Sequence, residues 1–133
     1  MSAWRRGGIE RLPEFRSLIE QATSPMSLWI DLRLAFEDAY DEGNQDRVRK
    51  ILEFARMCWS SSSSDVVTAV MCGFFEHLPE RAEIRKALPA LITSAEYAQL
   101  KEVFRYHAGD AAMAELDRAF KDPQRFKIQS RAK

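Results

Sequence analysis

The sequence predicts an all-α protein, a bundle of six to seven helices built from antiparallel hairpins, for which packing like that of HEAT or TPR repeats is one option. Apolar residues recur at three- and four-residue steps along most of the 133 residues, and no segment alternates at period two over more than a few residues. Proline, glycine and serine interrupt this pattern at intervals that suit helix ends. Nine of the thirteen residues from 66 to 78 are apolar and face every direction of a helix. A central helix at about 65–77 should therefore be enclosed by the others.

The first half of the chain is predicted to form one short helix and then a hairpin of two longer ones. Apolar spacing indicates a helix near 11–22, and Pro25 opens the next helix, which runs to about residue 42. Gly43 suits the left-handed end of that helix, and the side chain of Asn44 can cap the helix that follows. This next helix ends in the serine run 60–64. Its residues expected to face inward are Val48, Ile51, Leu52, Ala55, Cys58 and Trp59.

Two prolines are expected to divide the chain after the central helix. Pro79 should end that helix, residues 80–88 should form a short helix, and Pro89 should end this short helix. Gly73 lies inside the central helix, where glycine costs about 1 kcal/mol relative to alanine. We expect the close approach of a neighbouring helix to explain it.

The last two helices form a second predicted hairpin. Thr93 or Ser94 caps the first of them, with Glu96 near its positive end. Gly109 and Asp110 repeat the pattern of Gly43 and Asn44, in which a glycine ends one helix and a polar residue begins the next. The last helix is expected to turn Met113, Leu116 and Phe120 inward.

Length and composition describe one ordinary globular domain, expected over 1–120, followed by a basic tail over 121–133. The 20 basic and 20 acidic residues cancel, which makes nucleic acid an unfavourable partner. The longest apolar run, residues 69–75, is far shorter than the roughly 20 residues of a membrane span, and the N-terminal arginines precede no signal-like apolar stretch. We therefore expect a cytoplasmic protein without a membrane partner, in which Cys58 and Cys72 are reduced and packed in the core.

Two pairs of residues could carry chemistry. Glu76 and His77 place an acid beside an imidazole, and Tyr106 and His107 end a later helix. The four would form one polar cluster if the two helix ends met, so they are the candidate binding residues. The adjacent side chains of Glu76 and His77 point about 100° apart on a helix, which favours a structural role for the pair. Their spacing also differs from the HExxH motif, in which two histidines on one helical face bind zinc. We therefore predict no catalytic residue, metal ligand or cofactor. The alternative is a metal-dependent or acid/base enzyme using Glu76, His77 and His107, which a separation of the histidines above about 10 Å would exclude.

Charge is distributed unevenly along the chain. The helix near 25–42 ends in an acidic face with like-charge pairs at i,i+4, which are mildly destabilising, whereas the residues from 118 onward are mostly basic. Two interpretations remain open: solvent and the nearby Arg47, Arg49 and Lys50 neutralise these acids, or the face meets a basic partner. In the second case the partner is another protein or the basic end of a second copy. The acidic face consists of Glu37, Asp38, Asp41 and Glu42.

Four strings resemble a bacterial family of small helical proteins of unknown function. They are FEDAYDEGN, ILEFARMCW, SDVVTAVMCGFFEHLP and VFRYH, in that order, with a leucine-proline break between the last two. The resemblance covers roughly residues 28–120, and its most specific parts are the Met57-Cys58-Trp59 ending and the Phe-Glu-His-Leu-Pro string. It implies an all-α fold and a bacterial origin, and it implies no activity, cofactor or substrate.

These observations predict a non-catalytic module that binds another protein, either a regulator or an immunity protein that neutralises a toxin encoded nearby. The prediction rests on the absence of catalytic motifs in the sequence and on the segregated acidic face. We expect the chain to be a monomer or a homodimer.

Overall fold

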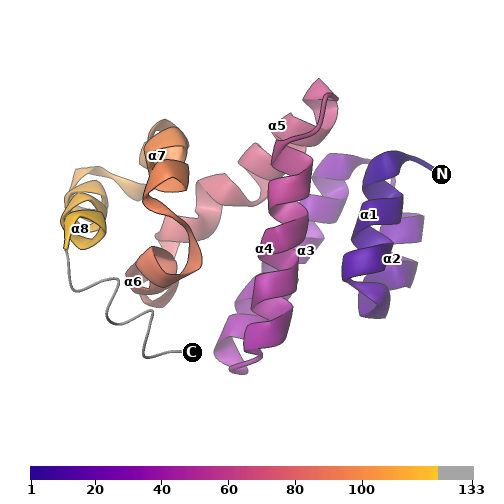
Figure 1. Ribbon diagram of the computed structural model, residues 1–133, viewed down its shortest axis with the longest axis horizontal. Coiled ribbons are helices and arrows are strands. Elements are labelled where there is room, and N and C mark those ends of the chain that lie inside the picture. The colour runs from indigo at the N-terminus through magenta and orange to yellow at the C-terminus, as the bar shows by residue number, and fades with distance from the viewer. Residues whose placement is uncertain (123–133) are drawn as a thin grey trace. The chain divides into compact units, whose positions relative to one another are not determined.

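The structure is a computed structural model that describes residues 1–122, and these form eight α-helices and two 3₁₀ helices with no strand (Figure 1). The predicted all-α class is confirmed, with one helix more than the highest number expected. The chain divides into two compact units, Met1–Phe74 and Phe75–Lys133, here called the N-terminal and C-terminal units. None of the helices in the described residues has the length and apolar character needed to cross a bilayer.

The N-terminal unit begins with a helix that the sequence prediction missed. The helix α1 spans Ala3–Arg11 and is followed by the 3₁₀ helix η1 over Pro13–Phe15 and by α2 over Arg16–Gln21. The predicted helix near 11–22 is therefore wrong as a continuous element. Leu12 leaves helical geometry at φ −131°, and Pro13 then starts a new turn. Gly7 and Gly8 disfavour a helix in isolation, so the sequence pattern does not predict α1. In the structure both glycines are buried where α1 packs against α4.

The central hairpin joins α3, Pro25–Asp41, to α4, Gln45–Trp59. Gly43 has φ +73°, and Asn44 Oδ1 accepts a hydrogen bond from the backbone N–H of Arg47 at 3.1 Å, so both predicted signals are confirmed. At the start of α3, Ser24 and Ser27 cap each other's backbone N–H groups. Local sequence chemistry thus fixes both ends of the hairpin.

The helix α5 spans Ser64–Gly73, so it is shorter than the central helix predicted at 65–77. Its inner face is enclosed as expected, with Val70 fully buried, but Thr68 and Cys72 on the opposite side are exposed. The prediction that apolar residues face inward all round the helix is therefore wrong for α5. A Cβ built on Gly73 would lie 3.0 Å from Trp29 Cβ, which confirms the predicted close approach of a neighbouring helix, here α3.

Aromatic rings form the centre of the N-terminal unit. Trp29 of α3 stacks on Phe54 of α4 with ring centroids 5.1 Å apart, and Phe74 lies at 5.1 Å from both Trp29 and Phe36. All four side chains are at most 1% exposed. Such ring pairs add about 0.5–1.5 kcal/mol each to the free energy gained by burying their surface. They hold α3, α4 and the end of α5 together.

The C-terminal unit consists of the 3₁₀ helix η2 over Phe75–Glu80, α6 over Ala82–Leu91, α7 over Ser94–Ala108 and α8 over Asp110–Lys121. The prediction that Pro79 ends the central helix is wrong, because the helix ends at Gly73 and Pro79 lies within η2. Pro89 does not end the following helix either, since α6 continues through Pro89 to Leu91. Only two residues follow Pro89 in α6, so the hydrogen bond that proline cannot donate lies in the last turn.

The helices α7 and α8 form the second predicted hairpin. Thr93 and Glu96 form a capping box at the start of α7, and Gly109 has φ +82° at the turn. Tyr97 of α7 is buried, stacks on Phe120 of α8 at 4.2 Å, and donates a hydrogen bond of 2.6 Å to Asp117. The part of the predicted basic tail from residue 123 onward lies outside the described residues.

The packing of α1 predicts different effects for two adjacent substitutions. A Cβ at Gly8 would lie 2.8 Å from the ring of the buried Phe54, whereas a Cβ at Gly7 would meet the flexible thioether of Met57. We expect Gly8→Ala to lower the free energy of unfolding by about 1–3 kcal/mol. The matched Gly7→Ala should change little or gain up to about 1 kcal/mol, because Met57 can move and alanine favours the helix. Denaturant unfolding measures both, and equal effects would contradict this account of the interface.

The Tyr97–Asp117 hydrogen bond predicts a pH-dependent stability difference. The Tyr97 hydroxyl, followed by Lys101, lowers the pKa of Asp117 below its usual value. A carboxyl with a lowered folded-state pKa stabilises the fold above its unfolded pKa, near 4, and that stabilisation is lost as the pH falls through the folded pKa. Tyr97→Phe should therefore lower Tm at pH 7, and its difference from wild type should narrow below about pH 4. Thermal unfolding from pH 3 to 7 checks this, and a pH-independent difference would contradict it.

Candidate functional site

The structure brings three of the four predicted binding residues into direct contact. The 3₁₀ helix η2 supplies Glu76 and His77, and the last turn of α7 supplies His107. His107 Nε2 lies 2.5 Å from Glu76 Oε1. The rings of His77 and His107 are stacked with centroids 4.9 Å apart and planes at 19°. The two histidines therefore lie closer than the limit of about 10 Å beyond which a shared site would be excluded.

Glu80 is a fourth member of this cluster that the sequence prediction missed. Its Oε1 lies 2.9 Å from His77 Nδ1 and 4.0 Å from His107 Nδ1. The reason is the winding of η2: with three residues per turn, side chains at i and i+3 eclipse, so His77 lies directly beside Glu80. The FEHLPE string contained this signal, because Pro79 disfavours an α-helix there. We call Glu76, His77, Glu80 and His107 the His–Glu cluster.

Burial differs across the His–Glu cluster. The side chain of Glu76 is 13% exposed and that of His77 is 23% exposed, whereas His107 and Glu80 are 36% and 38% exposed. Tyr106 packs edge-on against His107, with centroids 5.1 Å apart, but is itself 79% exposed. The cluster thus has an inner carboxylate and an outer side open to solvent, with Tyr106 at its edge.

The predicted acidic face lies on the last turns of α3. Glu37 pairs with Arg33 at 3.5 Å, whereas Asp38, Asp41 and Glu42 are exposed. Within residues 1–122, the side chains of Asp38 and Glu42 form no ion pair. The bases proposed to neutralise this face pair with other acids: Arg47 with Glu14, Arg49 with Asp46 and Glu53, and Lys50 with Asp46.

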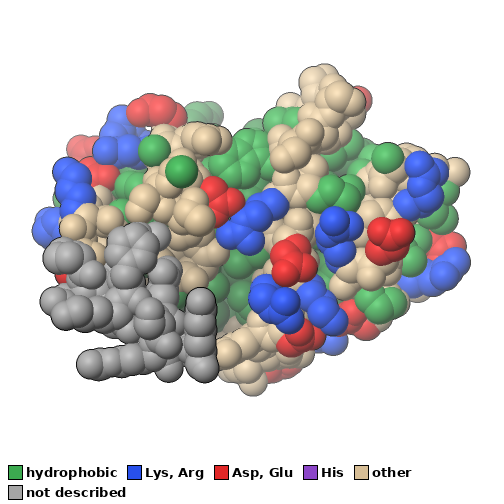
Figure 2. All heavy atoms as spheres, in the orientation of Figure 1, with side chains coloured by type: hydrophobic (Ala, Val, Ile, Leu, Met, Phe, Trp, Pro, Cys, Tyr) green, Lys and Arg blue, Asp and Glu red, His purple; other side chains and the backbone are tan. Residues whose placement is uncertain are grey.

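Two exposed apolar side chains extend the acidic face along α3, which the sequence prediction did not identify. Ile30 is 43% exposed and Leu34 is 50% exposed. At 100° per residue, Ile30, Leu34, Glu37 and Asp41 lie within about 60° of one another around the helix, and Asp38 and the C-cap residue Glu42 lie up to about 80° further round. We call Ile30, Leu34 and the acidic face the α3 surface. By contrast, acidic and basic side chains are interspersed over α4 (Figure 2).

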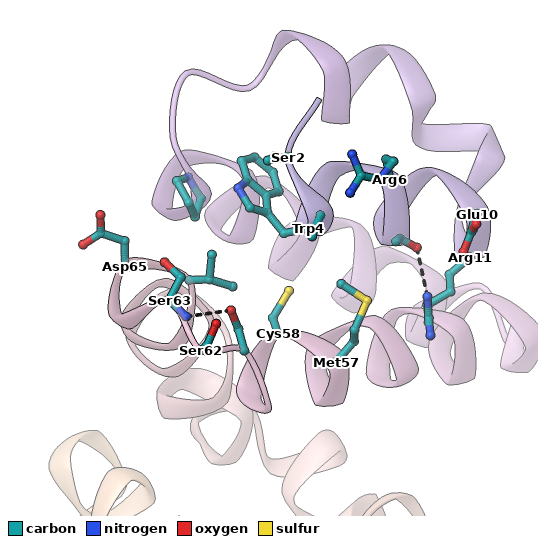
Figure 3. A pocket seen from close by; sticks show the side chains of 15 residues that line it. Ser2, Trp4, Arg6, Glu10, Arg11, Met57, Cys58, Ser62, Ser63 and Asp65 are labelled. Carbon is teal, nitrogen blue, oxygen red and sulfur yellow. Dashed lines mark hydrogen bonds between the residues drawn. The ribbon is translucent and has the colours of Figure 1, made fainter.

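An open cavity of about 880 Å³ lies in the N-terminal unit, between α1, the end of α4 and the start of α5 (Figure 3). Trp4, Arg6 and Cys58 are among the residues that line it. Burial raises the pKa of Cys58 to about 11, so this thiol is neutral at physiological pH and is a poor nucleophile. Cys58 therefore gives the cavity no activated thiol, and the cavity shares no residue with the His–Glu cluster.

The fold and these sites define an all-α protein with a histidine–carboxylate cluster and an acidic helix surface. Residues 8–106 match the family described as Domain of unknown function (DUF7674), and the chain belongs to that family. No curated protein and no solved structure matches the chain. The matched region contains Glu76, His77 and Glu80 and ends one residue before His107. The predicted resemblance to a family of unknown function is confirmed by this match.

The two cysteines are predicted to differ in reactivity. The structure joins neither in a disulfide; Cys58 is buried as expected, but Cys72 is exposed on α5, so its predicted place in the core is wrong. We expect a thiol reagent at pH 8 to modify one thiol per native chain. Cys72→Ser should abolish this fast reaction and Cys58→Ser should preserve it, because a thiol of pKa about 11 holds only about one part in a thousand as thiolate at that pH. Fast modification of both thiols in the native state would contradict the burial of Cys58.

Proposed function

We propose that this chain is a non-catalytic binding module whose α3 surface takes a basic, partly apolar segment of another protein. The observation that carries the proposal is the charge at the end of α3. The helices α4, α7 and α8 each have an acid in the first turn and a base in the last, as the helix dipole favours. The helix α3 has no base in its last turn and carries acids there instead.

This arrangement is locally unfavourable. Carboxylates at a helix C-terminus face the negative end of the dipole, which costs about 0.3–1 kcal/mol each, and the i,i+4 pairs Glu37/Asp41 and Asp38/Glu42 add a few tenths of a kcal/mol. The exposed Ile30 and Leu34 on the same side of α3 also leave apolar surface in water. A partner with basic and apolar side chains would relieve both costs through charge complementarity and apolar burial.

A bacterial cytoplasmic role as a regulator or an immunity protein remains our prediction for this module. Its support is the sequence resemblance to a bacterial family and the binding character of the α3 surface.

The second candidate is the metal-dependent or acid/base enzyme using Glu76, His77 and His107. The observation in its favour is the contact between Glu76 and His107, which pairs a carboxylate with an imidazole. Enzymes usually hold the substrate in a cavity beside such groups. The cavity of Figure 3 lies in the other unit, so we rank this function second.

Charge reversal on α3 tests the proposal. We expect wild-type protein to capture a specific basic protein from native lysate, and the triple variant Asp38→Lys, Asp41→Lys, Glu42→Lys to lose it. The captured protein is then purified, and its Kd should rise at least about tenfold with the triple variant and increase with salt. Leu34→Ala should also weaken binding, because it removes apolar contact.

A second triple variant, Glu20→Lys, Asp65→Lys, Glu102→Lys, is the matched control, since these exposed acids lie on three other helices. It should retain the partner. If the bound protein is this chain itself, size-exclusion chromatography will show a dimer that the α3 variant dissociates. Identical sets of captured proteins for wild type and the α3 variant would remove the hypothesis.

A further inference from the structure

We propose that the His–Glu cluster binds a divalent transition-metal ion of the zinc type through His77 Nδ1, the Glu80 carboxylate and His107 Nδ1. One donor atom from each of these three residues lies within 4.8 Å of the other two. Donors around one zinc ion at about 2.0–2.2 Å lie within about 4 Å of one another. His77 Nδ1 forms a hydrogen bond of 2.9 Å with Glu80 Oε1, so metal binding at Nδ1 moves the ring proton to Nε2 or releases it to solvent. Small side-chain rotations would then bring the three donors to bonding distance.

The position of Glu76 gives an independent reason for a cation at this place. A neutral histidine has one N–H and one lone pair, and the partner of one nitrogen determines the role of the other. In the neutral form of His107, the contact between Nε2 and Glu76 Oε1 requires the proton on Nε2 and leaves the lone pair on Nδ1. Nδ1 faces the Glu80 carboxylate at 4.0 Å, so two electron-rich atoms oppose each other. A cation between them removes this conflict.

This arrangement matches the way proteins support metal-bound histidines. A histidine that binds a metal through one nitrogen commonly donates its other N–H to a carboxylate, which fixes the ring and raises its basicity. Glu76, the least exposed member of the cluster, holds this position relative to His107. We assign Glu80 as a metal ligand and Glu76 as a positioning residue.

Charge and ligand type point to the class of ion. Within residues 1–122, neither Glu76 nor Glu80 is paired with a lysine or an arginine, so the two carboxylates leave two negative charges that a divalent cation would balance. Imidazole ligands favour zinc and its neighbours over magnesium and calcium, which prefer oxygen. The exposure of Glu80 and His107 leaves room for water to complete the coordination.

The bound ion would connect η2 to α7 inside the C-terminal unit. The segment η2 is a short 3₁₀ helix, a form with poorer hydrogen bonds than an α-helix. Ligands from both elements would add a cross-link where the backbone is weakest. The inference does not depend on the proposed binding role of α3, since every ligand lies in the other unit.

Zinc titration of the full chain tests the proposal. The protein is prepared without a histidine tag, stripped with a chelator and titrated with zinc chloride by calorimetry, and we expect one ion per chain. His77→Gln, Glu80→Gln and His107→Gln should each weaken binding at least about 100-fold, whereas Glu76→Gln should weaken it about 10- to 100-fold, as loss of a supporting carboxylate does. Glu102→Gln, an exposed carboxylate elsewhere on α7, should bind zinc as wild type does.

Nitrogen chemical shifts of the histidines provide a readout that needs no variant. On addition of zinc, the Nδ1 resonances of both histidines should move, while Nε2 of His107 remains protonated. Circular dichroism of each metal-free variant identifies any that fail to fold. The α3 triple variant should bind zinc unchanged, which separates this inference from the proposed function.

Two results would overturn the proposal. The first is wild-type protein that takes up no zinc, which would leave the cluster as contacts among its own side chains. The second is zinc binding that survives in the folded His77→Gln and His107→Gln variants, which would place the ion elsewhere.

Discussion

The change from α-helical to 3₁₀ winding after Gly73 is the constraint on which the candidate chemistry depends. Pro79 has no N–H to donate, and in an α-helix its ring would collide with the carbonyl four residues earlier. The chain leaves the α-helix at Phe74, with φ −130° and ψ −71°, and continues as the 3₁₀ helix η2, which accommodates Pro79. The 3₁₀ winding places His77 beside Glu80 and turns Glu76 to a different side, where it meets His107.

Features determined by a few neighbouring residues could be predicted from the sequence. Gly43 and Asn44, Thr93 and Glu96, and Gly109 end or begin helices through backbone conformation and side-chain hydrogen bonds that short sequence segments specify. The helix α1 could not be predicted in the same way. Its two glycines are unfavourable in an isolated helix, and only the close packing against Phe54 and Met57 on α4 explains them.

The candidate site was predictable in part. Glu76, His77 and His107 stood out because histidine is rare in this chain and each lies near a helix end, but their contact depends on tertiary structure. Glu80 is absent from the predicted cluster because Pro79 is expected to end the central helix, which assigns Glu80 to the next element, whereas one 3₁₀ helix holds both His77 and Glu80. On α3, the positions of Ile30 and Leu34 are visible in the sequence: both lie off the predicted inner face, and apolar residues on the outer face of a helix can mark a contact surface.

The two candidate surfaces differ in how much the fold depends on them. The α3 surface lies on the outside of a helix whose inner face is held by Trp29 and Phe36, so its acids can change without opening the aromatic core. The His–Glu cluster instead joins two elements of its unit, and one of these, η2, has weak backbone hydrogen bonding of its own. Loss of a contact there would affect local order, and under the proposed zinc binding it would remove a ligand as well. Binding at α3 should therefore leave the local stability of its unit nearly unchanged, whereas occupation of the cluster should stabilise η2 and α7 together.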